Sequence, residues 1–254
     1  MVVVGSTGVN GRVWASLITG EPGFLRVIDG RTLRIDASPV PSDPLDENLQ
    51  PGMNVGLISI DLSSRRRMRL NGKAEWRPEG LYVEAEQVYG NCPKYIQARE
   101  LESAGGSTSI APGSVRRAEI LTDEQRHLIS SSDTFFVASA HPDGGVDASH
   151  RGGPPGFVRF LAEDTLAFPD YCGNNTFNTL GNIAANPKTG LLFVDFERGG
   201  ILQLSGEAWV VWDPARATEF AGARRVVEFR TEEIVENAVP LRWRFVTYSP
   251  FDPA

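Results

Sequence analysis

Short apolar runs separated by turn-forming residues recur along the chain, and they predict β-strands. Val, Leu, Phe and Trp are frequent in residues 134–140, 157–161, 190–196 and 201–211. Turn-forming sequences bound several of these runs, at residues 142–145 (Pro-Asp-Gly-Gly) and 198–200 (Arg-Gly-Gly). Runs of this length joined by short turns favour antiparallel pairing, so the pattern predicts a mainly β fold.

Three short stretches between the apolar runs carry a helical pattern instead. They are residues 122–130, 178–185 and 214–221. The first opens with Thr122 and Gln125, which have the spacing of a capping box. Each group of strands is therefore expected to form a small closed sheet that a few short helices cover.

The chain repeats itself. Thirteen residues of the segment 4–35 recur at an offset of 133: Val4, Ser6, Gly11, Val13, Ala15, Ser16, Gly20, Pro22, Gly23, Phe24, Arg26, Thr32 and Leu33. Further on the offset becomes 134, and residues 56–57, 61, 70, 72 and 74 recur as residues 190–191, 195, 204, 206 and 208. A repeat of this length indicates two whole domains rather than a solenoid.

The repeat predicts a domain organisation. We expect a first domain over residues 1–100, a linker over 101–120 that contains the Gly/Ser-rich residues 103–112, and a second domain over 121–254. The second copy has a helix near Thr122 ahead of its first strand, whereas the first copy begins almost directly in its strand. Either the first copy lacks this helix or the natural chain begins earlier.

Charge and composition narrow the function classes. The net charge is −7 and the sequence pI is about 5.1, which argues against nucleic acid as a partner. No apolar run approaches the roughly 20 residues that a membrane span needs, and the first residues do not resemble a signal peptide. The two cysteines occupy different places in the two copies, so no disulfide framework is expected. These features favour a cytoplasmic location.

Divergence between the copies points to a candidate site. Residues 173–179 of the second copy (Gly-Asn-Asn-Thr-Phe-Asn-Thr) offer a glycine turn, amides and hydroxyls at the start of a helix, as an anion such as phosphate requires. The first copy has Asp43, Asp46 and Glu47 at the corresponding place, which would repel an anion. Upstream, residues 150–151 (His-Arg) correspond to residues 17–18 (Leu-Ile). The sequence thus predicts a polar pocket in the second copy and a filled one in the first.

Three segments carry a family resemblance. Residues 149–158 (Ser-His-Arg-Gly-Gly-Pro-Pro-Gly-Phe-Val), 173–183 and 186–193 resemble the pyridoxamine 5'-phosphate oxidase-like, FMN-binding split-barrel superfamily. The resemblance is good over about 121–212 and weaker over the first copy, where residues 92–99 resemble a segment that follows the main strands in this superfamily. Members are usually homodimers that bind FMN at the subunit interface. The resemblance therefore implies two tandem antiparallel split β-barrels packed as an intrachain pseudo-dimer, with a further homodimer left open.

The resemblance also implies which residues hold the cofactor. The second copy would bind the phosphate and ribityl chain, and the first copy would contribute residues across the interface. The expected cofactor-binding residues are His150, Arg151, Asp170, Gly173, Asn174, Asn175, Thr176, Asn178 and Thr179, with Lys94, Gln97 and Arg69 from the first copy. The Ser-Arg-Lys cluster of the true oxidases is replaced here by residues 173–175 (Gly-Asn-Asn), which is nearer to other FMN-binding relatives.

Several of these residues also have a purely structural interpretation. His150 fits a surface strand position, and Asn178 and Thr179 fit helix caps. Both cysteines fit small, partly buried thiols better than nucleophiles. Residues 65–67 (Arg-Arg-Arg) fit a solvated charge run at a hairpin turn, whereas Arg69 alternates to an inward face. Trp243 fits a core or interface filler, with a place over a flavin edge as the alternative.

The functional expectation is an FMN-binding flavoprotein that acts as an FMN-dependent oxidoreductase on a small-molecule substrate or reductant. No catalytic acid, base or nucleophile stands out, as is usual where a flavin performs the chemistry, and the three histidines lack metal-ligand spacing. Two alternatives remain open. One is a non-catalytic flavin or small-ligand binding protein, and the other is a cofactor-free split-barrel scaffold.

Overall fold

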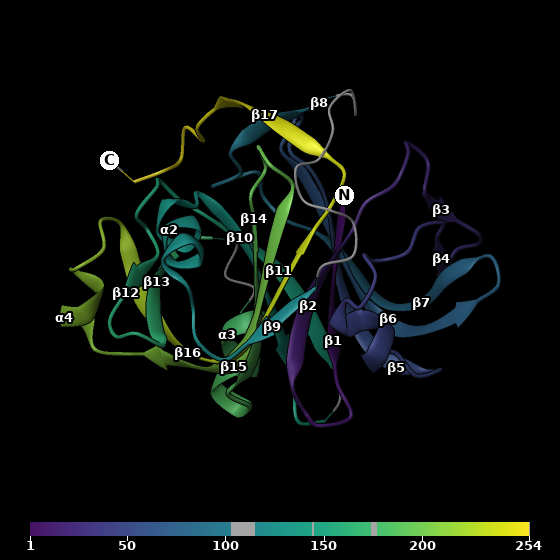
Figure 1. The fold of residues 1–254 in the computed structure, drawn as a ribbon, viewed down its shortest axis with the longest axis horizontal. Coiled ribbons are helices and arrows are strands. Elements are labelled where there is room, and N and C mark those ends of the chain that lie inside the picture. Colours follow the sequence, from purple (N-terminus) through teal and green to yellow (C-terminus); the bar gives the residue numbers. More distant parts are fainter. Residues whose placement is uncertain (103–114, 144, 174–176, 254) are drawn as a thin grey trace.

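Two large antiparallel sheets with the same strand order make up most of the molecule (Figure 1). The computed structural model describes residues 1–102, 115–143, 145–173 and 177–253. The first sheet has the order β2-β1-β5-β6-β7-β4-β3, and the main path of the second is β11-β10-β14-β15-β16-β13-β12. Each strand of the first sheet has its counterpart at the same place in the second. The predicted mainly β fold with two tandem antiparallel units is confirmed.

The first sheet is formed by residues 2–90, with one short helix between its strands. Its elements are β1 (Val2–Thr7), β2 (Val13–Ile18), β3 (Leu25–Val27), β4 (Thr32–Ile35), α1 (Pro44–Asn48), β5 (Met53–Asp61), β6 (Arg66–Arg77) and β7 (Gly80–Gly90).

The second sheet follows the same plan with more helix between its strands. Its elements are α2 (Asp123–Ser131), β10 (Thr134–Ala140), β11 (Val146–Gly152), β12 (Arg159–Phe160), β13 (Thr165–Tyr171), α3 (Asn178–Ala185), β14 (Lys188–Val194), β15 (Gly200–Val211), α4 (Pro214–Ala217) and β16 (Ala223–Ala238). Among the described residues, no pairing joins the two end strands of either sheet, so each sheet is open at that seam.

Three further strands lie outside this shared plan. β8 (Ala98–Glu102) pairs with β17 (Arg242–Thr247) in a separate two-stranded sheet. β9 (Arg116–Ala118) pairs with β16, although it lies within the predicted linker 101–120. The Gly/Ser-rich residues 103–112 of that predicted linker lie outside the described residues.

The main apolar cores lie within each half and between the halves. One core lies within the first half, around residues such as Ile18, Leu45 and Leu81. Another lies within the second half, where Phe135 stacks on Phe193 with 5.0 Å between ring centroids. The remaining core mixes fully buried residues of both halves: Val3, Val13, Ala15, Ile58, Phe136, Ala138, Ala148 and Leu192. The halves thus pack against each other over a shared apolar core, as the implied pseudo-dimer requires.

The locally encoded helices appear where they were expected. Thr122 and Gln125 form the capping box of α2, and α3 has the predicted bounds. The helix predicted over 214–221 ends at Ala217, because the chain continues through turns to Gly222, whose φ is 71°. The strand predicted over 157–161 is only β12, and the one over 190–196 is β14, which ends before Asp195 caps the next turn. None of the described helices is long and apolar enough to span a membrane.

Candidate functional site

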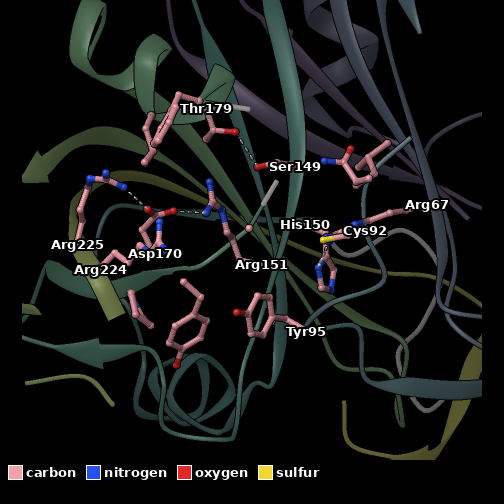
Figure 2. A pocket seen from close by; sticks show the side chains of 18 of the residues that line it. Arg67, Cys92, Tyr95, Ser149, His150, Arg151, Asp170, Thr179, Arg224 and Arg225 are labelled. Atoms are coloured by element: carbon pink, nitrogen blue, oxygen red, sulfur yellow. Dashed lines mark hydrogen bonds and ion pairs between the residues drawn. The ribbon is translucent and has the colours of Figure 1, made fainter. Parts of the chain in front are cut away.

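A pocket lies between the two halves, at the place where the sequence predicts one (Figure 2). The second half contributes strands β11 and β13, the start of α3 and the beginning of β16. The first half contributes β6 and the segment 91–95 that follows β7. Its volume is about 110 Å³.

Five arginines line this pocket: Arg67 and Arg69 from the first half, and Arg151, Arg224 and Arg225 from the second. Asp170 lies between two of them, because its Oδ1 is 3.1 Å from Arg151 and its Oδ2 is 3.0 Å from Arg225 (Figure 2). One carboxylate therefore orients two guanidinium groups and neutralises only one charge.

Arg67 has no carboxylate partner among the described residues. Its guanidinium donates to the carbonyl oxygen of Lys94 at 3.4 Å and contacts Nδ1 of His150 at 2.8 Å. Burial is the main cause that lowers the pKa of Arg67, to about 10, so it remains a cation at neutral pH. Arg224 likewise has no salt-bridge partner in the described part of the chain.

A buried polar network fixes the inner wall of the pocket. Asp147 of β11 forms an ion pair with Arg69, accepts a hydrogen bond from Tyr89 at 3.1 Å, and accepts one from Thr179 at 3.0 Å. Thr179 also lies 3.0 Å from Ser149 (Figure 2). Burial raises the pKa of Tyr89, which keeps its hydroxyl protonated as a donor. The network therefore joins the two halves through charge-assisted hydrogen bonds.

Four buried nitrogens of the pocket lining have no hydrogen-bond partner among the described residues: Nε of Arg67, Arg69 and Arg151, and Nε2 of His150. Buried polar groups in proteins are normally paired, and a guanidinium Nε is always a donor. Excess positive charge and unmet donors together suit an acceptor-rich, anionic ligand.

Aromatic rings form another wall of the pocket. The rings of Tyr95 and Tyr171 lie 5.1 Å apart at an angle of 33°, and the Tyr95 hydroxyl donates to the carbonyl oxygen of Cys172 at 2.9 Å. Burial raises the pKa of Tyr171 to about 12, so it stays neutral. Phe177, which is 47% exposed, and Cys92 also line the pocket. These side chains offer apolar and aromatic contacts to a planar group of a ligand.

The structure brings half of the predicted site residues together. Arg69, His150, Arg151, Asp170, Gly173 and Thr179 all line the pocket. Asn174, Asn175 and Thr176 lie outside the described residues.

Three predicted residues have other partners. Asn178 donates to the Tyr89 hydroxyl at 2.9 Å, and Lys94 lies over the ring of Phe251, with Nζ 5.5 Å from the centroid. Gln97 binds the backbone N–H of Ser249 and the carboxylate of Asp252. The C-terminal segment occupies Lys94 and Gln97, so neither lines the pocket.

Sequence reasoning missed several lining residues and misplaced Arg67, whereas it interpreted Trp243 correctly as a core or interface filler. Arg67 is not part of a solvated charge run. It follows the same alternation along β6 that placed Arg69 inward, and that signal was available. Arg224 and Arg225 had no signal, because only the pairing of β13 with β16 brings them beside Asp170. Trp243 packs edge-on against Phe196 and does not line the pocket.

Comparisons with known proteins agree with the family resemblance. The family model described as Pyridoxamine 5'-phosphate oxidase matches residues 121–238. No curated protein matches the chain.

Similar solved structures each cover about half of the chain. HupZ of Group A Streptococcus is 19% identical, covering 47% of this chain and 98% of that one, with a TM-score of 0.38. A pyridoxinephosphate oxidase family protein of Clostridium acetobutylicum, related to general stress protein 26, is 14% identical, with coverages of 48% and 92% and a TM-score of 0.35. A FAD-binding protein of Mesorhizobium loti is 13% identical, with coverages of 50% and 99% and a TM-score of 0.33. The model match over residues 121–238 makes the second half of this chain similar to the pyridoxamine 5'-phosphate oxidase family.

Proposed function

We propose that this protein is a flavoprotein that binds FMN in the pocket between its halves and acts as an oxidoreductase on a small molecule. The observation that carries the proposal is the charge of the pocket. Five arginines line it, whereas only Asp170 and Asp147 pair with them among the described residues. Such an excess of cations in a protein of net charge −7 indicates a local anion site.

The donors present fit a phosphate. A phosphate dianion prefers several convergent guanidinium and N–H donors, and Arg151, Arg224 and Arg225 all line the pocket. Asp170 orients Arg151 and Arg225, as a fixed anion-binding pair requires. Arg151 would therefore hold the phosphate, and Arg67 and Arg69 would contribute positive charge from the first half.

The size of the pocket limits what it holds. Its volume of about 110 Å³ is smaller than the roughly 300–1,000 Å³ typical of small-molecule sites. FMN would therefore place its phosphate and part of its chain inside and extend past Tyr171 and Phe177 at the mouth. When bound, a flavin supplies the electron or hydride transfer, and the protein supplies position and electrostatics.

The location and the partner of the protein are part of the same proposal. We propose a cytoplasmic protein whose partner is a small-molecule substrate or reductant, which the free thiols of Cys92 and Cys172 support. The two halves would serve as the two subunits of a fused dimer, with one site per chain in the pocket between them. The non-catalytic alternative differs only in whether the bound flavin turns over.

An FMN titration of purified protein tests the proposal. Replacing Arg151 with Ala removes a charged donor, so we expect affinity to fall by about 10- to 150-fold, as a loss of roughly 1.5–3 kcal/mol implies. Arg198→Ala is the matched control, since it removes the same charge from a side chain that is 82% exposed and outside the pocket. Equal affinities for both variants would reject the site, and absence of FMN binding by the wild type would reject the cofactor. Bleaching of bound flavin by NAD(P)H and recovery in air would identify an oxidoreductase.

A further inference from the structure

His150 of β11 is buried in the wall of the pocket and contacts a cation from the other half of the chain. Nδ1 of His150 lies 2.8 Å from NH1 of Arg67, and only 7% of His150 is exposed. A guanidinium carries donors and no acceptor, so Nδ1 must accept this hydrogen bond. A neutral ring that accepts at Nδ1 carries its proton on Nε2.

The surroundings of His150 keep the ring neutral. Burial lowers the pKa of His150 well below its ordinary value, and the positive charges of Arg67, Arg151 and Arg99 lower it further. On its other side the ring meets Phe136 edge-on, with 5.6 Å between centroids. His150, which lines the pocket, is thus a neutral imidazole in a single tautomer.

This tautomer leaves one donor unmet. Nε2 of His150 is buried and has no hydrogen-bond partner among the described residues. An unpaired buried donor is costly, so a pocket ligand that accepts this hydrogen bond gains affinity. A metal ion would need the lone pair of Nε2, which the Nε2–H tautomer does not offer.

We infer that His150 is a specificity-determining residue that donates from Nε2 to an acceptor atom of the bound flavin, and that Arg67 sets its tautomer from the first half. The inference rests on the proposed function, because the oxidised flavin ring presents carbonyl oxygens and unprotonated nitrogens as acceptors. Recognition of the ligand then depends on both halves, since the donor lies on β11 and the residue that orients it lies on β6.

The tautomer is testable without any flavin, by nitrogen NMR of protein labelled in its three histidines. His127 and His141 are exposed, so His127→Gln and His141→Gln assign the spectrum and serve as controls. We expect His150 to show a protonated Nε2 and a bare Nδ1, because Nδ1 accepts from the guanidinium of Arg67. Arg67→Met should let the Nδ1–H tautomer appear. A wild-type ring protonated on Nδ1 would overturn the inference.

An FMN titration tests the hydrogen bond itself. His150→Gln keeps a side-chain donor and should bind FMN within about twofold of wild type, whereas His150→Phe should bind about 3- to 12-fold more weakly, the loss of one neutral hydrogen bond. Both variants should keep wild-type affinity for inorganic phosphate, because the arginines are intact. Wild-type affinity in His150→Phe, or equal losses in both variants, would refute the role of His150. A wild type that binds no FMN would refute the proposed function and this inference together.

Discussion

The second half keeps its pocket open with His150 and Arg151, and the first half has Leu17 and Ile18 at the corresponding places. Both apolar side chains are almost fully buried, Leu17 in the core between the halves and Ile18 in the core of the first half. The two places share their strand order and their neighbours, so the difference arises from side chains alone. One fold can therefore carry a ligand pocket or a filled core at the same position.

Each half also extends a polar side chain into the other half. This side chain is charged in the first half and neutral in the second. Arg69 of β6 reaches Asp147 in the second half, and Gln203 of β15 reaches Ser16 and the carbonyl oxygen of Ala15 in the first. A polar side chain of each half thus contacts the other half. An ion pair joins the halves beside the pocket. Neutral hydrogen bonds join them at the filled side, where the first half has apolar residues in place of the pocket.

We expect the largest loss of stability from removing the ion pair between Arg69 and Asp147. Arg69→Ala leaves the Asp147 carboxylate buried without its cation, so the free energy of unfolding should fall by about 3–5 kcal/mol. Gln203→Ala removes only neutral donors and should cost about 1–3 kcal/mol. Urea denaturation of both variants measures the difference. A Gln203→Ala loss as large as that of Arg69→Ala would contradict the proposed asymmetry.

The filled side contains a buried carboxyl whose titration should be visible in stability. Asp43 is fully buried and caps α1 by accepting from the backbone of Leu45 at 2.9 Å. Burial is the main cause that raises the pKa of Asp43 from 3.8 to about 6, and the neighbouring Asp46 raises it further. The protonated form is therefore favoured in the folded state. Stability from this group is fully present below pH 3.8 and is lost as pH rises through about 6.

Asp43→Asn separates this titration from the cap, because Asn also caps helices well. The variant should be more stable than wild type near pH 7 by up to about 3 kcal/mol, an order-of-magnitude figure from the pKa shift, and the advantage should vanish near pH 4. Denaturation midpoints between pH 4 and pH 7 measure this. A constant difference between the two proteins over that range would show that Asp43 does not titrate there.

The sequence predicted well what is encoded locally. The capping box of α2 and the bounds of α3 depend on neighbouring residues, and both were confirmed. The duplication was visible because a repeat preserves spacing. The pocket was predicted from the divergence at residues 150–151, since a polar pair in place of an apolar one is a local signal.

Long-range pairing was beyond the sequence. Arg225 lies beside Asp170 only because β16 pairs with β13, and no local pattern indicates this register. Gln97 is bound by Ser249 and Asp252, which are more than 150 residues away along the chain. Sequence reasoning therefore identified the strand that carries the site and missed three of the five arginines that line it.

Two glycines at equivalent positions of the two halves should respond equally to substitution. Gly56 lies against the second half, where an added Cβ would be 2.4 Å from Cα of Asp147. Its repeat counterpart Gly190 lies against the first half, where a Cβ would be 2.7 Å from the carbonyl oxygen of Val13. Gly56→Ala and Gly190→Ala should each destabilise the protein by about 1–3 kcal/mol through overpacking. Thermal unfolding of both variants is the measurement, and a loss in only one of them would show that the halves do not pack symmetrically.

The smallest effect is expected at the surface of the filled side. Glu47 of α1 is 59% exposed and contacts Arg117 of β9 at 2.8 Å. Because an exposed ion pair contributes little, Glu47→Gln should change the free energy of unfolding by about 0–1 kcal/mol. It should also leave FMN affinity unchanged, because Glu47 does not line the pocket. A parallel FMN titration checks this, with Arg151→Ala as the reference for a loss. Tighter FMN binding by Glu47→Gln would mean that removing an acid exposes a second anion site, and the first half would then have to be treated as a weakened pocket rather than a filled one.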